Sequence, residues 1–265
     1  MPRHFLSHIL AALVLLTLLP GPALAETAQE KGRRLAAQVG VEPGFRDQSV
    51  SGEMILTTAS GQTSTRRFEA RSVETGPEEA RSVLIFDWPG DIRGTALLTH
   101  SHGGGRDDDQ WLYLPAVSKV RRISSSGRSG AFVGSEFAYE DMVDQDVEKY
   151  TYAFVSTGAC PGGGRCDIVD RFPTGRSAYS AQRLWIDAGR HLIRQVQYFD
   201  RRKAHVKTMV VSGYRQYQGR YWRASQMVMT NHLTGKGTTL TWRDFRFNQG
   251  LNPADLTVNA LRRGL

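Results

Sequence analysis

The sequence predicts a mainly β fold with a few short helices, an α+β arrangement in which one antiparallel sheet forms a single domain. From residue 50 onward, apolar side chains recur at every second position, as they do along strands. Long strand-like segments then follow one another, joined by turns of two to four residues, and such short turns require antiparallel pairing. So many strands in a flat, open sheet would expose an apolar face, so we expect the sheet to curl.

Residues 1–25 predict a secretory signal peptide. Arg3 gives a basic start, residues 5–19 form an apolar run, and residues 23–25, Ala-Leu-Ala, form an A-x-A cleavage site after a Pro/Gly break. The alternative is a transmembrane anchor, but an anchor needs roughly 20 continuous apolar residues and this run is shorter. Because neither cysteine lies near the cleavage site, we expect the mature chain, residues 26–265, to be a periplasmic protein without a lipid anchor.

A helix is predicted over residues 26–39, at the start of the mature chain, because its apolar residues share a helical spacing and Gly40 ends the run. Alternating apolar residues bounded by glycine and proline indicate strands after it. The expected strands cover residues 50–57, 63–73, 81–88, 94–100, 110–114, 119–123, 149–157, 165–172, 180–187, 191–200, 203–217, 220–232 and 237–247. The other helical segments that we expect are 135–142 and 252–261.

The chain is basic, with 34 Lys and Arg residues against 26 Asp and Glu residues and a formal net charge of +8. Arg3 belongs to the predicted signal peptide, so the mature chain carries about +7. A basic exported protein is suited to transient contact with anionic lipid head groups at a membrane surface. Nucleic acid is not an expected partner, because the compartment is wrong and no basic motif with interleaved aromatic residues occurs.

The two cysteines, Cys160 and Cys166, predict one disulfide, because an exported chain meets an oxidising compartment. Strand-like segments flank them on both sides, so the bond would close a glycine-rich hairpin tip. Redox activity is the alternative, but the spacing is not C-x-x-C and no neighbouring histidine or helix start would activate a thiol. Metal binding by these two thiols is less favoured still.

Candidate metal ligands are His100 and His102, which are followed by Asp107, Asp108 and Asp109. Imidazole and carboxylate are suitable ligand types, but three glycines intervene and no third histidine or EF-hand spacing completes a site. A polar hairpin loop is therefore the favoured interpretation. The sequence also contains no nucleophile elbow and no phosphate-binding loop. We expect a binding protein rather than an enzyme, without catalytic residues, metal or cofactor.

Apolar residues occupy both faces of the late strands, in two alternating sets. The first set is Met209, Val211, Met227 and Met229, with Met54 and Leu56 of the first strand in matching alternation. The second set is Trp222, Val228, Leu240 and Trp242. Both faces need a cover, so we expect a helix over one and a ligand on the other. Methionine is flexible and suits loosely specified apolar ligands, although it serves equally as core filling.

One stretch of the sequence resembles a known family. Its motifs are Phe86-Asp-Trp-Pro89, Asp91-Ile-Arg-Gly-Thr-Ala-Leu-Leu98, Asp109-Gln-Trp-Leu-Tyr-Leu-Pro115, Val120-Arg-Arg-Ile123 and Phe132-Val-Gly-Ser-Glu-Phe-Ala-Tyr-Glu-Asp141. They resemble the outer-membrane lipoprotein-sorting protein family of the LolA-like superfamily. The start of the first strand and the late strands fit the same family, so the resemblance covers nearly all of the mature chain.

The resemblance implies a single strongly curved antiparallel sheet, a half-open barrel, in which short helices cover a cavity that binds acyl chains. It implies no catalytic residues, and some relatives are thought to work with inner-membrane transporters of the RND type. The residues that we expect to line the cavity are Met54, Leu56, Phe86, Trp88, Leu98, Met227 and Met229.

Two roles fit these expectations. The first is a periplasmic carrier that binds a lipid, or the acyl chains of a lipoprotein, for transport toward the outer membrane, driven by about 0.8 kcal/mol per buried CH₂ group. The alternative is a lipid-sensing or adaptor module that works with an inner-membrane RND-type transporter or an envelope-stress regulator, with residues 124–141 as its contact surface. A hydrolase is disfavoured, because no nucleophile–base pair is evident.

Overall fold

The computed structural model describes residues 25–40, 44–143 and 146–263. The predicted signal peptide, residues 1–25, lies outside the described residues except for Ala25, so it stays a prediction. The described part is mostly β, with one large antiparallel sheet and two α-helices, and this confirms the fold class predicted from the sequence.

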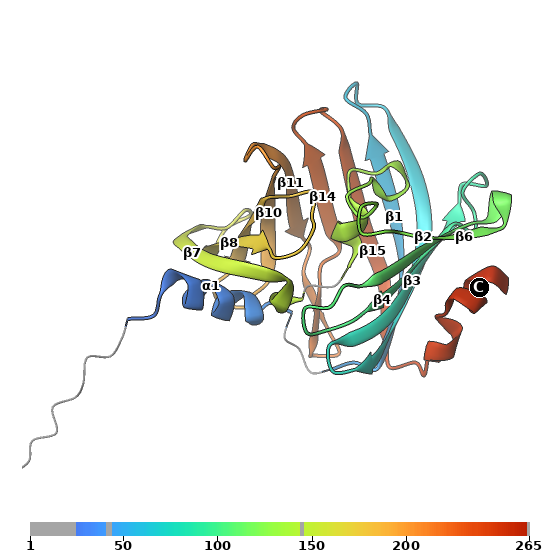
Figure 1. The fold of residues 1–265 in the computed structure, drawn as a ribbon, viewed down its shortest axis with the longest axis horizontal. Coiled ribbons are helices and arrows are strands. Elements are labelled where there is room, and N and C mark those ends of the chain that lie inside the picture. The colour runs from blue at the N-terminus through green and yellow to red at the C-terminus, as the bar shows by residue number, and fades with distance from the viewer. Residues whose placement is uncertain (1–24, 41–43, 144–145, 264–265) are drawn as a thin grey trace, which may run out of the picture.

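Thirteen strands form one sheet in the order β6-β5-β4-β3-β2-β1-β15-β14-β11-β10-β9-β8-β7. The sheet curves strongly, but its edge strands β6 and β7 do not pair with each other, so the barrel stays half-open (Figure 1). The strands of this sheet are β1 (Asp47–Thr57), β2 (Thr63–Gly76), β3 (Glu79–Trp88), β4 (Ala96–Ser101), β5 (Asp109–Leu114), β6 (Lys119–Arg122), β7 (Tyr150–Ala159), β8 (Arg165–Pro173), β9 (Ala181–Asp187), β10 (Ile193–Phe199), β11 (His205–Ser212), β14 (Gln226–Asn231) and β15 (Gly237–Phe247).

Two of the predicted long strands, 203–217 and 220–232, are each divided in the structure. The residues far from the turn that joins the two segments form the main-sheet strands β11 and β14. The residues next to that turn form a separate two-stranded ribbon, β12 (Arg215–Tyr217) and β13 (Tyr221–Arg223). The chain changes direction at Gly213, which has φ +67°, and a Cβ there would lie 2.0 Å from the Ser225 Oγ. The left-handed φ and this close approach favour glycine at the crossing, and continuous strands were the wrong expectation here.

The predicted N-terminal helix is present as α1 (Ala28–Ala37). A capping box starts it: the Thr27 hydroxyl accepts from the Glu30 N–H at 3.2 Å, and the Thr27 N–H donates to the Glu30 carboxylate at 2.8 Å. The helix lies along β7 and β8 near one edge of the sheet (Figure 1). Leu35 and Ala36 are buried there as part of the main core.

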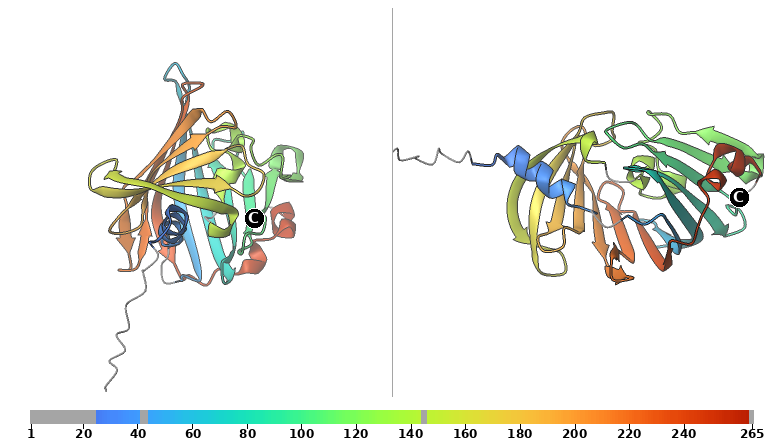
Figure 2. Two further views of the ribbon diagram at one scale, coloured as in Figure 1. Left: turned by 60° about the vertical axis from the view of Figure 1, so that its left-hand side comes forward. Right: turned by 90° about the horizontal axis from the view of Figure 1, so that it is seen from below.

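The concave side of the sheet holds the main core and the connection between β6 and β7, residues 123–149, called the β6–β7 loop below. This loop turns into the curve of the sheet (Figure 2). Its Phe132 is fully buried and stacks on Phe86, with 5.9 Å between ring centroids. The helical turn expected at 135–142 is a short 3₁₀-helix, η3 (Tyr139–Met142), and η2 (Phe132–Gly134) precedes it.

A second, smaller core lies on the other face of the sheet, where the C-terminal segment packs over β2–β6. Leu256 and Leu261 pack there against Val83 and Leu98. The terminal helix expected at 252–261 is two pieces, the 3₁₀-helix η5 (Pro253–Asp255) and α2 (Val258–Arg263). Across the described ranges, no helix combines the length and apolar character needed to span a membrane.

The apolar set predicted to face away from the methionines is only partly correct. Leu240 pairs with both Met54 and Met227, so its side chain shares the concave face with them, and Trp242 follows on the same face. The register between β14 and β15 determines which face Leu240 shares with Met227. The alternation of residues within one strand does not reveal that register. Val228 does lie on the opposite face, as expected.

Candidate ligand-binding cavity

A cavity of about 800 Å³ opens at one end of the concave side. Its lining comes from the end of α1, the β2–β3 hairpin, the β6–β7 loop, the strands β10, β11 and β14, and the region of the β12–β13 ribbon. Small-molecule sites in proteins span roughly 300–1,000 Å³, so the cavity is large enough for an organic ligand.

One wall of the cavity, called the methionine wall, is apolar and consists of Val196, Met209, Val211 and Met227. The strand register brings these side chains together, because Val196 pairs with Met209 and Val211 pairs with Met227. The Tyr198 hydroxyl lies 3.8 Å from the Met209 sulfur and orients that thioether. Unbranched methionine side chains can repack around apolar groups of different shapes, so this wall suits a flexible chain.

Another part of the lining, called the polar end, is hydrophilic. It consists of Gln48, Ser72, Glu74, Glu78 and Glu79. Gln48 and Ser72 are paired on β1 and β2, and the three glutamates follow where β2 turns into β3. The polar end and the methionine wall therefore come from opposite halves of the sheet, and the curvature of the sheet brings them around one space.

The β6–β7 loop contributes a partly desolvated carboxylate, Asp141, to the lining. Its Oδ2 accepts from the Ala138 N–H at 2.8 Å and from the Tyr179 hydroxyl at 3.0 Å. Burial, helped by nearby Glu140, raises the pKa of Asp141 to about 6 against the opposing effects of the Ala138 N–H and Lys207. Burial, and then the nearby Asp141, raise the pKa of Tyr179, which stays protonated.

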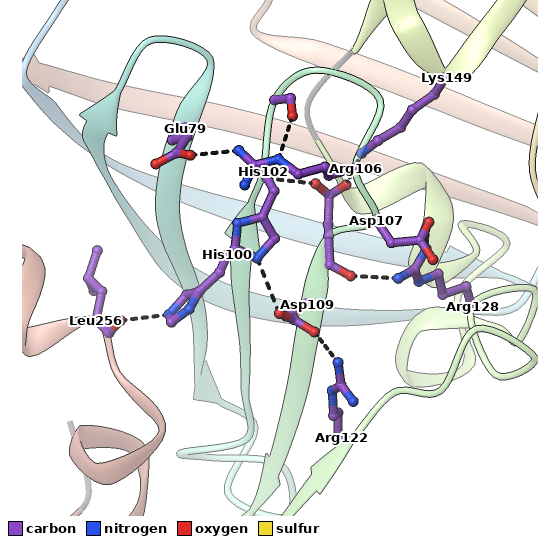
Figure 3. Close-up of polar contacts among 12 residues, drawn as sticks. Glu79, His100, His102, Arg106, Asp107, Asp109, Arg122, Arg128, Lys149 and Leu256 are labelled. Carbon is purple, nitrogen blue, oxygen red and sulfur yellow. Dashed lines mark hydrogen bonds and ion pairs between the residues drawn. The ribbon is translucent and has the colours of Figure 1, made fainter.

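The candidate metal ligands of the sequence are spread over separate polar contacts (Figure 3). His100 Nε2 lies 3.0 Å from the Leu256 carbonyl oxygen, and His102 Nε2 lies 3.2 Å from Asp109 Oδ2 (Figure 3). Arg122 pairs with the same Asp109. Burial lowers the pKa of His100, which favours its neutral form.

The two remaining aspartates of this region are also paired. Asp107 accepts from Arg128 at 2.9 Å, and the almost fully buried Asp108 accepts from Lys149 at 2.7 Å. These contacts tie the β4–β5 loop to the β6–β7 loop. Within the described residues, no group of three or more His, Cys, Asp and Glu side chains is arranged to hold a metal ion.

The structure places five of the seven predicted cavity residues on the concave side. Of these five, Met227 lines the cavity. Met54, Phe86 and Met229 are fully buried in the main core, and Leu56 packs against it. These four residues shape the concave side without contributing to the lining.

The other two predicted residues lie elsewhere. Leu98 is fully buried on the opposite face, in the cluster covered by the C-terminal segment. Trp88, at the end of β3, is 40% exposed, and the Arg67 guanidinium lies 5.6 Å from its ring. The disulfide between Cys160 and Cys166 is present at the tip of the β7–β8 hairpin, as the sequence predicted.

Several lining residues were not selected from the sequence. Val196, Tyr214 and Trp222 contribute apolar surface, and the hairpin glutamates Glu74 and Glu78 contribute charge. Val211 and Met209 had been grouped with Met227 by their alternation, and that signal could have extended the predicted site to them. The glutamates carry no such signal, because a charged hairpin is ordinary surface in any sequence.

An unclosed, strongly curved antiparallel sheet with a cavity on its concave side defines a class of proteins with the LolA-like fold. Within this class, the chain belongs to the outer-membrane lipoprotein-sorting protein family. A family model described only as an uncharacterized protein matches residues 78–263. Among curated proteins, none matches the chain significantly.

Three solved structures illustrate these similarities. An outer-membrane lipoprotein-sorting protein domain from Vibrio parahaemolyticus is 41% identical, with a TM-score of 0.83, over 89% of this chain and 100% of that one. A DUF1329 family protein from Desulfovibrio piger is 30% identical, with a TM-score of 0.84, over 89% of this chain and 99% of that one. A LolA superfamily protein from Nitrosomonas europaea shares the fold: it is 17% identical, with a TM-score of 0.68, over 88% of this chain and 99% of that one.

Proposed function

We propose that this protein is a periplasmic carrier that binds a lipid, or the acyl chains of a lipoprotein, in the 800 Å³ cavity and shields them on the way toward the outer membrane. The observation that carries the proposal is the methionine wall, the apolar part of the cavity lining, in which Met209 and Met227 stay partly exposed above the buried Val196 and Val211. In this proposal residues 26–265 form the binding domain, and residues 1–25 are removed on export.

Apolar burial alone supplies enough affinity for this role. Ten CH₂ groups moved from water into the cavity contribute about 8 kcal/mol, of which part offsets the loss of translational and rotational freedom. A dissociation constant of about 1 μM needs a net 8 kcal/mol, so one or two chains suffice for reversible carriage. Binding of this kind needs no reacting groups.

Two further observations support the periplasm as the site of action. The Cys160–Cys166 disulfide fits an oxidising compartment. The basic net charge of the chain favours transient contact with anionic membrane surfaces, where a carrier loads and unloads. The inner-membrane transporter and the stress regulator of the alternative role stay predictions.

The proposal is tested by identifying what the protein carries. We would purify it from the periplasm of its native bacterium and analyse bound molecules by mass spectrometry, expecting close to one equivalent of lipid or acylated protein. A Met227→Trp variant, whose bulkier side chain narrows the cavity at the methionine wall, should bind less of that ligand. Val228→Trp is the matched control, because Val228 lies on the opposite face of the same strand and should retain it.

Recovery of the unmodified protein without any lipid or acylated protein would contradict the proposal. The same conclusion would follow if Met227→Trp and Val228→Trp bound equal amounts of ligand, because the methionine wall would then have no part in binding. Circular dichroism and thermal unfolding of both variants establish that each one folds before its bound molecules are compared.

A further inference from the structure

The cavity is chemically asymmetric, and this asymmetry restricts what can occupy it. The methionine wall on β10, β11 and β14 offers apolar contact, whereas the polar end at the β2–β3 hairpin offers carboxylates and amides. An amphiphile placed with its tail on the methionine wall leaves its head at the polar end. The reverse placement would bury carboxylates against apolar groups and remove their hydration, which is costly.

The charge of the lining has the opposite sign to the charge of the chain. The whole sequence carries +8, yet the cavity is lined by more carboxylates than basic side chains. The acidic residues are Glu74, Glu78, Glu79, Asp108, Glu140, Asp141, Asp146 and Glu148, and the basic residues are Lys149, Arg171 and Arg223.

The three basic side chains of the lining are engaged with the protein itself. Lys149 donates to Asp108 at 2.7 Å, and Arg171 donates to Gln182 at 2.6 Å. Arg223 donates to Gln48 at 3.1 Å and lies 5.1 Å from the Phe45 ring. These cations are therefore held in place by the lining and are poorly placed to receive an anionic head. Three of the lining carboxylates are ion-paired as well, Glu79 with Arg106, Asp108 with Lys149 and Glu148 with Arg33, so Glu78 matters most for a ligand.

Glu78 offers the clearest charge for a ligand at the polar end. It is exposed at the tip of the β2–β3 hairpin, with φ +59°, and its carboxylate has no hydrogen-bond or ionic partner among the described residues. A buried imidazole nitrogen, His191 Nδ1, also lines the cavity without a hydrogen-bond partner among the described residues. The exposed Glu78 carboxylate therefore remains available to a cationic head, whereas His191 Nδ1, in the turn between β9 and β10, is buried.

We propose that the cavity selects amphiphiles with a positively charged polar part, bound with the acyl chain along the methionine wall and the cationic part at the β2–β3 hairpin. This inference rests on the proposed carrier function, of which it specifies the ligand class. The cation belongs either to a basic peptide that carries the acyl chain or to an amine-bearing lipid head group. In both cases an anionic head on the same chain is disfavoured by the carboxylates around it.

The test compares ligands that share one acyl anchor. Three dipalmitoylated cysteinyl peptides, ending in four lysines, four serines or four glutamates, are titrated against the full-length mature protein by displacement of the neutral dye N-phenylnaphthylamine. We expect the lysine peptide to bind about tenfold more tightly than the glutamate peptide at low salt, with the serine peptide between them. The difference should shrink as salt is added, because the cavity is open to solvent.

Charge-neutralising variants show whether the polar end is responsible. The double variant Glu74→Gln/Glu78→Gln should reduce the preference for lysine over glutamate several-fold and leave the affinity for the serine peptide unchanged. Glu69→Gln is the matched control, because it removes one charge from the opposite face of the same strand and should keep the preference. An undiminished preference in the double variant would overturn the proposal.

The outcomes separate this inference from the function on which it rests. If all three peptides displace the dye with equal affinity, and the two lysolipids named below do so too, the carrier function stands and the selection of a cationic head is wrong. If none displaces the dye, both fail. The source of the cation is identified by repeating the titration with lysophosphatidylethanolamine and lysophosphatidylglycerol of equal chain length. Selection among the peptides or between the two lysolipids supports the proposal, and absence of selection in both series overturns it.

The orientation is tested by photocrosslinking. A lysine peptide with a diazirine at the end of its acyl chain should label β11 or β14, and one with the diazirine on its last lysine should label the β2–β3 hairpin, as read by peptide mass spectrometry. The reverse pattern would show that the amphiphile enters the other way round and would overturn the proposed orientation.

Discussion

Gly32 of α1 lies directly on the backbone of β7 at Phe154: a Cβ at Gly32 would come within 2.8 Å of the Phe154 nitrogen. The neighbouring residue strengthens this contact, since the Lys31 ammonium lies 3.5 Å from the centre of the Phe154 ring. The helix that borders the cavity is thus docked on its strand at a distance that only glycine permits.

Gly32→Ala should therefore weaken the docking of α1 even though alanine is the better helix former. The substitution gains about 1 kcal/mol of helix propensity and loses about 1–3 kcal/mol to overpacking against β7. We expect a lower free energy of unfolding in urea and faster proteolysis within α1. Gln29→Ala, on the exposed side of the same helix, should change neither, and a stabilised Gly32→Ala protein would contradict this account.

Phe132 anchors the β6–β7 loop in the main core, where it is fully buried and stacked on Phe86. Phe132→Ala should lower the free energy of unfolding by about 3–5 kcal/mol, because the large ring leaves a cavity that the sheet cannot close. The exposed Val117→Ala serves as the control and should change stability by less than about 0.5 kcal/mol. Equal effects in the two variants would mean that the loop is not held by this contact.

The sheet could be largely predicted from the sequence, because alternation and short turns are local signals. The main failures occur where distant parts meet. Leu240 was assigned to the wrong face, since its position depends on the register with Met54 and Met227 rather than on its own strand. Leu98 was placed in the cavity, yet the C-terminal segment, far away in the sequence, covers its face.

The candidate site was predictable only in part, for the same reason. Met227 carries a local signal, the methionine-rich alternation, and it lines the cavity. Glu74 and Glu78 line it too, but they reach it through the summed twist and curl of many strands, which no local pattern reveals. The apolar wall could thus be partly anticipated, whereas the charged end required the folded structure.

The Cys160–Cys166 disulfide closes a short loop at the tip of the β7–β8 hairpin, and both cysteines are buried. Replacing both by serine should lower the free energy of unfolding by about 2 kcal/mol, because a loop this short regains little chain entropy when it opens. Neither cysteine lines the cavity, so dye binding should be unaffected. Urea unfolding and the dye titration check the two statements, and a loss of binding in a folded variant would contradict the second.

Asp141 should make the protein less stable as the pH rises from about 4 to about 6. Its pKa is about 6 in the folded protein against an ordinary 3.8, so the folded state holds the proton more tightly than the unfolded state. The Asp141 side chain therefore contributes stability below pH 4, where it is protonated in both states. This contribution is lost as the pH rises through the folded pKa of about 6. Asp141→Asn keeps an oxygen that can accept from Ala138 and Tyr179 but removes the titration. In urea unfolding, the free energy of unfolding of Asp141→Asn should no longer fall between pH 4 and pH 6, whereas that of the exposed control Asp255→Asn should still fall. An unchanged fall in Asp141→Asn would assign the pH dependence to another group.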